Sequence, residues 1–338
     1  MDREISCVRS AVEAAQVKLL SAQAVSKLNV LAGLRPLTDT TDSITPDVFI
    51  IGAAKCGTSS LYDFLTSKPY VFKASIKEPD ALTNPAFEGK ELALWARLFE
   101  GAGEKLKIDA STSYARRSLH PQAAEKAKKF APNARVIYVV RDPIPRLVSH
   151  VTHRWLKEGM PRNVPMEEYL TYDHVPVFDG NYEWQLEPWL EQFGKDRVHV
   201  AVFEELTHVE GTLERRKLLS HIGINDHDHA EQLLPKENIS ESFVSDMRNL
   251  SVLSKYRDTA IGRLLRTVFP KHLRQGLLAP LKSEYISREI GRFAPVTPFE
   301  RAEIEKFGHI GYGSVDFSRF TDAWGLCTRQ WGVDYSSR

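Results

Sequence analysis

Asp47-Val-Phe-Ile-Ile-Gly52-Ala-Ala-Lys55-Cys-Gly57-Thr58-Ser59-Ser60-Leu-Tyr-Asp-Phe-Leu65 is the stretch of this chain that most strongly indicates its fold. The apolar residues from Val48 to Ile51 predict a strand buried on both faces of a sheet. Gly52 and Gly57 bracket a tight turn, because glycine adopts backbone conformations that other residues avoid. The three hydroxyl residues after Gly57 are expected to cap the helix that follows.

A strand, a glycine-bearing turn and a helix N-terminus together form an anion site. Backbone N–H groups point outward there, and the helix dipole favours negative charge. Lys55 adds a positive charge inside the turn, and Thr58, Ser59 and Ser60 add hydroxyl donors. The stretch therefore predicts a cradle for a phosphate-like group; the alternative is a plain strand-to-helix turn with an ordinary lysine.

The two glycines have the spacing of the nucleotide triphosphatase loop G-x-x-x-x-G-K-[ST], but Thr58 stands where that loop has its lysine. The lysine lies inside the loop instead. The segment Ala54-Lys55-Cys56-Gly57-Thr58-Ser59 resembles the 5′-phosphosulfate loop P-K-x-G-T-T of sulfotransferases that use 3′-phosphoadenylyl sulfate (PAPS). In this chain the proline is absent and one threonine is a serine.

The composition excludes several classes of protein. The 338 residues are 42% hydrophobic and 26% charged with a net charge of +1, so no overall charge attracts nucleic acid or a membrane surface. Cys7, Cys56 and Cys327 lie far apart, which predicts a reducing compartment, no disulfide framework and no metal cluster. Neither a membrane span nor a signal peptide is evident, and we expect a cytoplasmic protein.

Buried strands alternate with helical patterns along the rest of the chain. Further strands are predicted at 105–109, 135–140 and 198–203. The alternation predicts an α/β, P-loop-like three-layer fold with a central, mostly parallel sheet flanked by helices. Residues 1–46 are expected to form an N-terminal helix, over Arg9–Leu34, and a linker, and residues 47–338 the α/β domain. Residues 226–292 show few strand signals and predict helices and loops.

A second motif follows the predicted strand at 135–140. It consists of Arg141-Asp142-Pro143-Ile144-Pro145-Arg146-Leu147-Val148-Ser149. Ligands of open α/β sheets bind outside the carboxyl ends of the strands, where an arginine fork and a hydroxyl can hold a phosphate. The motif resembles R-[DN]-P-x-x-R-x-x-S, the 3′-phosphate site of the same sulfotransferases. The alternative is an arginine salt-bridged at a strand end.

Further segments extend the resemblance, which leans toward heparan-type and bacterial carbohydrate sulfotransferases. Asp109-Ala-Ser111-Thr112-Ser113-Tyr114 is similar to E-x-S-P-x-Y of that family, and Gly180 to Phe193 is similar to its G-x-Y-x-x-Q-L-x-x-W-x-x-x-F helix. Arg292 and Trp331 are candidates for its C-terminal cofactor loop.

The resemblance implies in-line transfer of a sulfuryl group from PAPS to a hydroxyl or amine, with 3′,5′-adenosine bisphosphate (PAP) as product and no metal. Lys55 then neutralises the bridging oxygen, and the loop hydroxyls bind the sulfonate. The implied cofactor-binding residues are Lys55, Cys56 (through its N–H), Gly57, Thr58, Ser59, Ser60, Arg141, Ser149 and Arg292.

Two residues are candidates for the base that takes the acceptor proton. Glu78 belongs to Lys77-Glu78-Pro79, which resembles the K-E-P segment that carries the proposed base of heparan-type enzymes. That family continues with His and aromatic residues, whereas this chain has Asp80-Ala-Leu. His153 lies one helical turn beyond Ser149 and has a suitable ordinary pKa. Lys77 and Asp109 are candidates to orient the acceptor.

Two other functions remain open from the sequence: a nucleotide-dependent kinase with an atypical loop, and a non-catalytic binding protein on the same fold. The sequence leaves the acceptor open among a carbohydrate, a lipid and a small molecule, and the near-neutral charge favours a small or weakly charged one. A homo-oligomer is also left open. The basic residues that would line an oligosaccharide groove are Arg116, Arg117, Arg154, Lys157 and Arg162.

Overall fold

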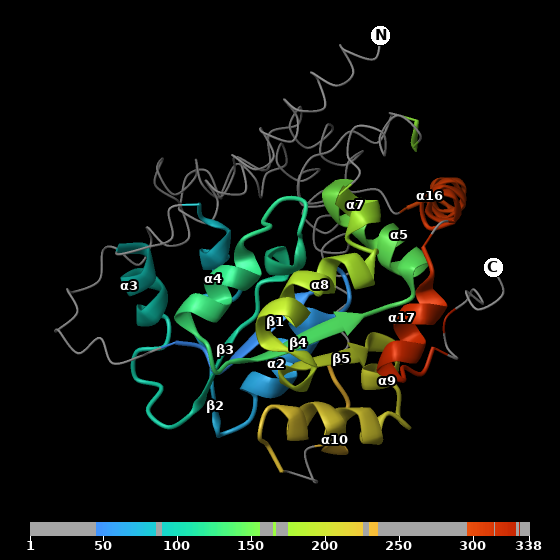
Figure 1. Cartoon of the computed structure of the whole chain (residues 1–338). Helices are drawn as coiled ribbons and strands as arrows, with labels where there is room; N and C mark the ends of the chain where they lie inside the picture. The colour runs from blue at the N-terminus through green and yellow to red at the C-terminus, as the bar shows by residue number, and fades with distance from the viewer. Residues whose placement is uncertain are drawn as a thin grey trace, which may run out of the picture.

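A computed structural model describes residues 45–85, 90–155, 165–166, 175–225, 230–235, 296–313, 315–328 and 331. Within these residues, five strands form one sheet in the order β2-β3-β1-β4-β5, and every strand pair is parallel (Figure 1). The strands are β1 (Val48–Gly52), β2 (Val71–Phe72), β3 (Leu106–Asp109), β4 (Arg135–Val140) and β5 (Val198–Val202).

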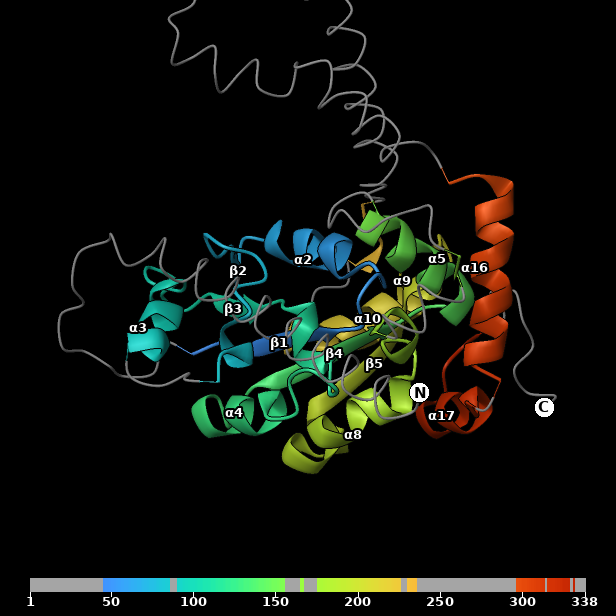
Figure 2. The ribbon, with the colours of Figure 1, turned by 90° about the horizontal axis from the view of Figure 1, so that it is seen from above.

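The strands at the middle of the sheet are buried on both faces. All five residues of β1 and the last five of β4 are buried, which explains their continuous apolar sequences. The helices that cover them are α2 (Thr58–Thr66), α4 (Ala123–Phe130), α5 (Pro143–His153) and α8 (Tyr182–Phe193). Figure 2 shows α2 and α5 on one side of the sheet and α4 and α8 on the other, which confirms the predicted layered α/β fold.

Shorter elements and the C-terminal helices complete the described part of the chain. They are α3 (Lys90–Arg97), α7 (Val175–Phe178), α9 (Phe203–Thr207), α10 (Thr212–His221), α16 (Pro298–Gly311), α17 (Phe317–Trp324) and the 3₁₀ turns η1 (Ala81–Thr83), η2 (Thr112–Ala115) and η4 (Lys195–Arg197). Helix α16 packs along α5, where Gly308 allows Ile144 to approach its backbone. None of the helices in the described residues has both the length and the apolar run needed to cross a bilayer.

The order of the strands positions the functional site. After β1 the chain adds β2 and β3 on one side, and β4 then pairs with the other side of β1. The carboxyl ends of β1 and β4 therefore lie side by side at a topological switch point, where α/β folds bind ligands.

Most of the predicted elements that lie within the described residues are confirmed. All four predicted strands are present, whereas β2, α7, α9, α17 and the 3₁₀ turns were not predicted. The helix expected over residues 9–34 and nearly all of 226–292 lie outside the described residues.

Candidate functional site

The loop after β1 has the backbone that its glycines predicted. Lys55 and Gly57 have φ values of 70° and 76°, and Gly57 is the N-cap of α2. A Cβ at Gly57 would lie 2.2 Å from Cε2 of Phe203, so only glycine fits there. The N–H groups of the first turn of α2 have no carbonyl partner within the helix and are donors for an anion.

The expected hydroxyl cap of α2 is wrong. No described side chain caps this helix end, because the helix begins at Thr58 itself and Gly57 occupies the N-cap position. Thr58 and Ser60 are buried and Ser59 is half-buried. The hydroxyl groups thus lie in the first helical turn instead of in front of it.

Lys55 and Arg141 meet, as the two motifs predicted. Arg141 Nη1 donates to the Lys55 carbonyl oxygen at 3.4 Å. At the other end of α5, His153 Nδ1 lies 3.2 Å from Lys55 Nζ. Ser149 is half-buried on the same face of α5 as His153, one turn earlier. Arg141 therefore contacts the backbone of the loop after β1, and His153 contacts its lysine side chain.

Lys77 connects Glu78 to the loop. Its Nζ donates to Ser59 Oγ and lies 3.6 Å from the Glu78 carboxylate. The Glu78 side chain is 35% exposed. The structure thus brings both candidate bases, Glu78 and His153, to the surroundings of the phosphate loop.

Cys56 lies behind the loop. Its N–H donates to the Ala53 carbonyl at 3.2 Å, and its thiol is buried against the Tyr182 hydroxyl at 3.9 Å. Burial raises the pKa of the thiol to about 12. Because its N–H is already bonded, we leave Cys56 out of the expected set of anion donors.

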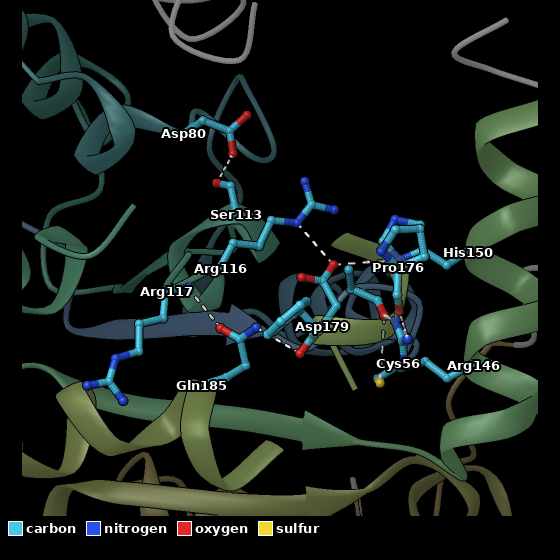
Figure 3. Close-up of polar contacts among 12 residues, drawn as sticks. Cys56, Asp80, Ser113, Arg116, Arg117, Arg146, His150, Pro176, Asp179 and Gln185 are labelled. Atoms are coloured by element: carbon cyan, nitrogen blue, oxygen red, sulfur yellow. Dashed lines mark hydrogen bonds and ion pairs between the residues drawn. The ribbon is translucent and has the colours of Figure 1, made fainter. Parts of the chain in front are cut away.

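Asp80, Ala81 and Leu82 take the place of the histidine and aromatic residues of heparan-type enzymes, and they belong to the core. Asp80 Oδ1 accepts from Ser113 Oγ at 2.5 Å, and its N–H donates to Ser111 Oγ at 3.1 Å (Figure 3). Ala81 and Leu82 are fully buried. Ala81 and Leu82 are therefore not available to line an acceptor site, whereas Asp80 is half-buried and bonded to Ser111 and Ser113.

Asp109 does not orient an acceptor, contrary to one expectation. It is 1% exposed and accepts hydrogen bonds from Trp95 Nε1, Ser111 Oγ and Tyr114 OH, each at 2.8 Å. Burial raises its pKa to about 6, although the three hydrogen bonds act in the opposite direction. Asp109 is therefore a structural carboxyl under the site.

Arg146 is a functional neighbour that the sequence analysis quoted but did not assign. It is fully buried, and its Nη1 donates to the Ala54 carbonyl of the loop at 3.5 Å. Its Nη2 donates to the Tyr312 hydroxyl at 2.8 Å and to the Pro176 carbonyl. In the sequence, only its position in the R-x-x-S part of the second motif indicated that Arg146 lies near the loop.

A buried carboxylate balances the charges around Arg146. Asp179 accepts from Arg116 Nε at 3.1 Å and lies 3.5 Å from His150 Nδ1, which in turn is 3.3 Å from Arg146 (Figure 3). Burial and the neighbouring arginines keep the pKa of His150 well below its ordinary value. His150 is therefore neutral and fills a structural position.

Glu204, in the first turn of α9 just after β5, was not predicted as a site residue. Its carboxylate lies 3.9 Å from Arg141 Nε and accepts from the Asp142 N–H at 3.2 Å. The other oxygen accepts from Trp331 Nε1 at 3.3 Å, which brings this candidate of the C-terminal loop next to Arg141. Burial raises the pKa of Glu204. Arg292 lies outside the described residues.

Among the described residues, no three His, Cys, Asp or Glu side chains are grouped so that they could hold a metal ion.

Comparison with known proteins gives consistent results. Mouse heparan sulfate glucosamine 3-O-sulfotransferase 3A1 is 29% identical over 160 residues, which cover 44% of this chain and 38% of the relative's own length. A sulfotransferase from Alicyclobacillus acidocaldarius (24% identity, TM-score 0.46) covers 62% of this chain and 95% of that one. The sulfotransferase domain from the curacin biosynthetic pathway (17% identity, TM-score 0.42) covers 58% and 80%. The family model described as "Sulfotransferase domain" matches residues 45–262, well over half of the sequence, and the chain belongs to that family.

Proposed function

We propose that this protein transfers the sulfuryl group of PAPS to a hydroxyl or amine of a small-molecule or carbohydrate acceptor and releases PAP. The observation that supports the proposal best is the contact of Arg141 with the Lys55 carbonyl. It joins the two motifs into one positively charged site at neighbouring strand ends, as a donor with two separate phosphate positions requires.

The residues present fit such a donor. Lys55 and the N–H groups at the start of α2 suit the 5′-phosphosulfate, and Gly57 keeps that helix end clear of side chains. Arg141 and Ser149 suit the 3′-phosphate. When bound, PAPS supplies the sulfuryl group and a leaving bisphosphate. Lys55 then stabilises the negative charge that develops on the bridging oxygen.

We assign the role of base to Glu78 and not to His153. A lysine ammonium only donates hydrogen bonds, so Nδ1 of His153 accepts from Lys55 and the ring carries its proton on Nε2. A neutral ring of this form has no nitrogen ready to take the acceptor proton. Glu78 has an ionisable, partly exposed carboxylate, and Lys77 holds it next to the loop. The proton of the acceptor hydroxyl or amine therefore passes to Glu78.

The charges near the site favour a small or weakly charged acceptor. Arg116 is bonded to the buried Asp179, and Arg117 is paired with Glu187. Arg154 is 8% exposed. Three of the five basic residues expected to line an oligosaccharide groove are thus paired or buried, while Lys157 and Arg162 lie outside the described residues.

Transfer of radiolabelled sulfate tests the proposal. The protein is incubated with ³⁵S-labelled PAPS and a panel containing a phenol, an aromatic amine and a glucosamine disaccharide. We expect labelled product with at least one acceptor and a loss of about 10²-fold or more in Lys55→Met and Glu78→Gln. Arg216→Ala is the control and should stay active, because Arg216 is an exposed residue of α10 that pairs with Glu231. Label transferred equally well by Lys55→Met would contradict the assignment of the site.

A further inference from the structure

Helix α5 and the chain just before it contact Lys55 at its carbonyl and at its ammonium. Arg141, two residues before α5, donates to the Lys55 carbonyl, and His153, the last residue of α5, contacts the Lys55 ammonium. Within the helix, Arg146 donates to the carbonyl of Ala54. The segment 141–153 thus contacts the carbonyls of two successive loop residues and the ammonium of Lys55.

The contact between His153 and the ammonium restrains the end of a long, flexible side chain. A lysine side chain has four rotatable bonds, and fixing it costs about 2 kcal/mol of rotamer entropy. A cation that stabilises a transition state acts best when it is held in place before the reaction. The nitrogen 3.2 Å from Lys55 Nζ belongs to His153, whose backbone is held in the last turn of α5.

We propose that His153 is a positioning residue for Lys55: Nδ1 of the imidazole accepts a hydrogen bond from the ammonium and holds that charge in the loop at the end of β1. The inference rests on the proposed function, because it assigns Lys55 its role in sulfuryl transfer. His153 acts through Lys55, so its loss lowers the rate of transfer more than it lowers the affinity for the donor.

The direction of the hydrogen bond follows from the chemistry of the two groups. A lysine ammonium only donates, so the 3.2 Å contact makes Nδ1 of His153 the acceptor and leaves the ring proton on Nε2. A ring protonated on both nitrogens has no acceptor for this bond and would place a second positive charge directly against the ammonium.

Two variants of the full chain test the inference. His153→Asn keeps an amide oxygen near the position of Nδ1 but cannot act as a base, and His153→Leu keeps the volume without an acceptor. The readouts are the affinity for PAP by calorimetry, and kcat and KM for PAPS with the best acceptor of the panel. In parallel, ¹⁵N NMR of histidine-labelled protein reports which nitrogen of His153 carries the proton.

We expect His153→Leu to lower kcat by about tenfold or more and to change the affinity for PAP and the KM for PAPS by less than about threefold. His153→Asn should recover most of the lost rate. The NMR spectrum should show the proton on Nε2. Unchanged kcat in His153→Leu, or a proton on Nδ1, would overturn the inference. Equal losses in both variants would make His153 the base. Failure of the unmodified protein to bind PAP would refute the proposed function, and the NMR result would still decide the Lys55–His153 pair.

Discussion

Arg141 donates a hydrogen bond to the backbone carbonyl of Lys55 at 3.4 Å, although 86 residues separate the two in the sequence. The contact exists because β1 and β4 are neighbours in the sheet, so the loop after one strand meets the residue after the other. The loop motif and the arginine motif are thus in direct contact at neighbouring strand ends.

Replacing the buried Arg146 should destabilise the whole domain. Arg146→Ala leaves the Ala54 and Pro176 carbonyls and the Tyr312 hydroxyl without their donor in a dry environment. We expect the free energy of unfolding to fall by at least about 3 kcal/mol, measured by urea denaturation. Arg146→Lys should recover little, because a single ammonium cannot reproduce the planar fork. A loss no larger than that of the exposed control Arg216→Ala would contradict the role given to Arg146.

Cys56 should resist alkylation in the folded protein. Burial raises the pKa of its thiol to about 12, so at pH 8 only about one molecule in 10⁴ carries the reactive thiolate. Cys327 is partly exposed and serves as the internal control. With iodoacetamide and peptide mass spectrometry, we expect Cys327 to be labelled much faster in native protein and both cysteines at similar rates in denaturant. Equal labelling in the native state would show that the loop opens.

Asp109 should make stability depend on pH below neutrality. Burial raises its pKa from 3.8 to about 6, so the folded state binds a proton more readily than the unfolded state between these values. The contribution of Asp109 to stability is therefore greatest below pH 4 and is lost as the pH rises to 6, by up to about 3 kcal/mol. Denaturation at pH 4.5 and 6.5 should show this trend as a difference between the natural chain and Asp109→Asn.

The comparison must be made between variants, because three histidines of the described residues act in the opposite direction. Burial lowers the pKa values of His120 and His221 to about 4 and that of His150 well below its ordinary value, so their contributions to stability are lost as the pH falls. All three histidines are present in Asp109→Asn, and their effect cancels in the difference. The control Asp196→Asn removes an exposed carboxylate and should keep the pH dependence of stability of the natural chain. If Asp109→Asn also keeps that pH dependence, the account of Asp109 is wrong.

The sequence predicted the elements that depend on local patterns. Continuous apolar runs identified β1, β4 and β5, and the two anion motifs placed Lys55 and Arg141 at strand ends. The cap of α2 was predicted wrongly, because whether a hydroxyl stands before or inside the first turn depends on the path of the loop. Sequence patterns alone do not give that path.

The residues that the sequence did not assign are those whose roles come from distant partners. Arg146 acquires its role from Ala54, Pro176 and Tyr312, and Glu204 from Arg141 and Trp331. His153 had the right position for a base, but its contact with Lys55 changes its chemistry. Each of these contacts joins segments far apart in the chain, which a pattern of neighbouring residues does not encode.

Calorimetric binding of PAP is the most direct test of the central claim that Lys55 and Arg141 form one donor site. We expect PAP to bind more tightly than ATP with Mg²⁺, and Arg141→Ala to weaken PAP binding by at least about tenfold while Arg216→Ala does not. Preference for ATP would contradict the account and favour a kinase. Tight PAP binding that survives in Arg141→Ala would show that the two strand ends do not share the ligand.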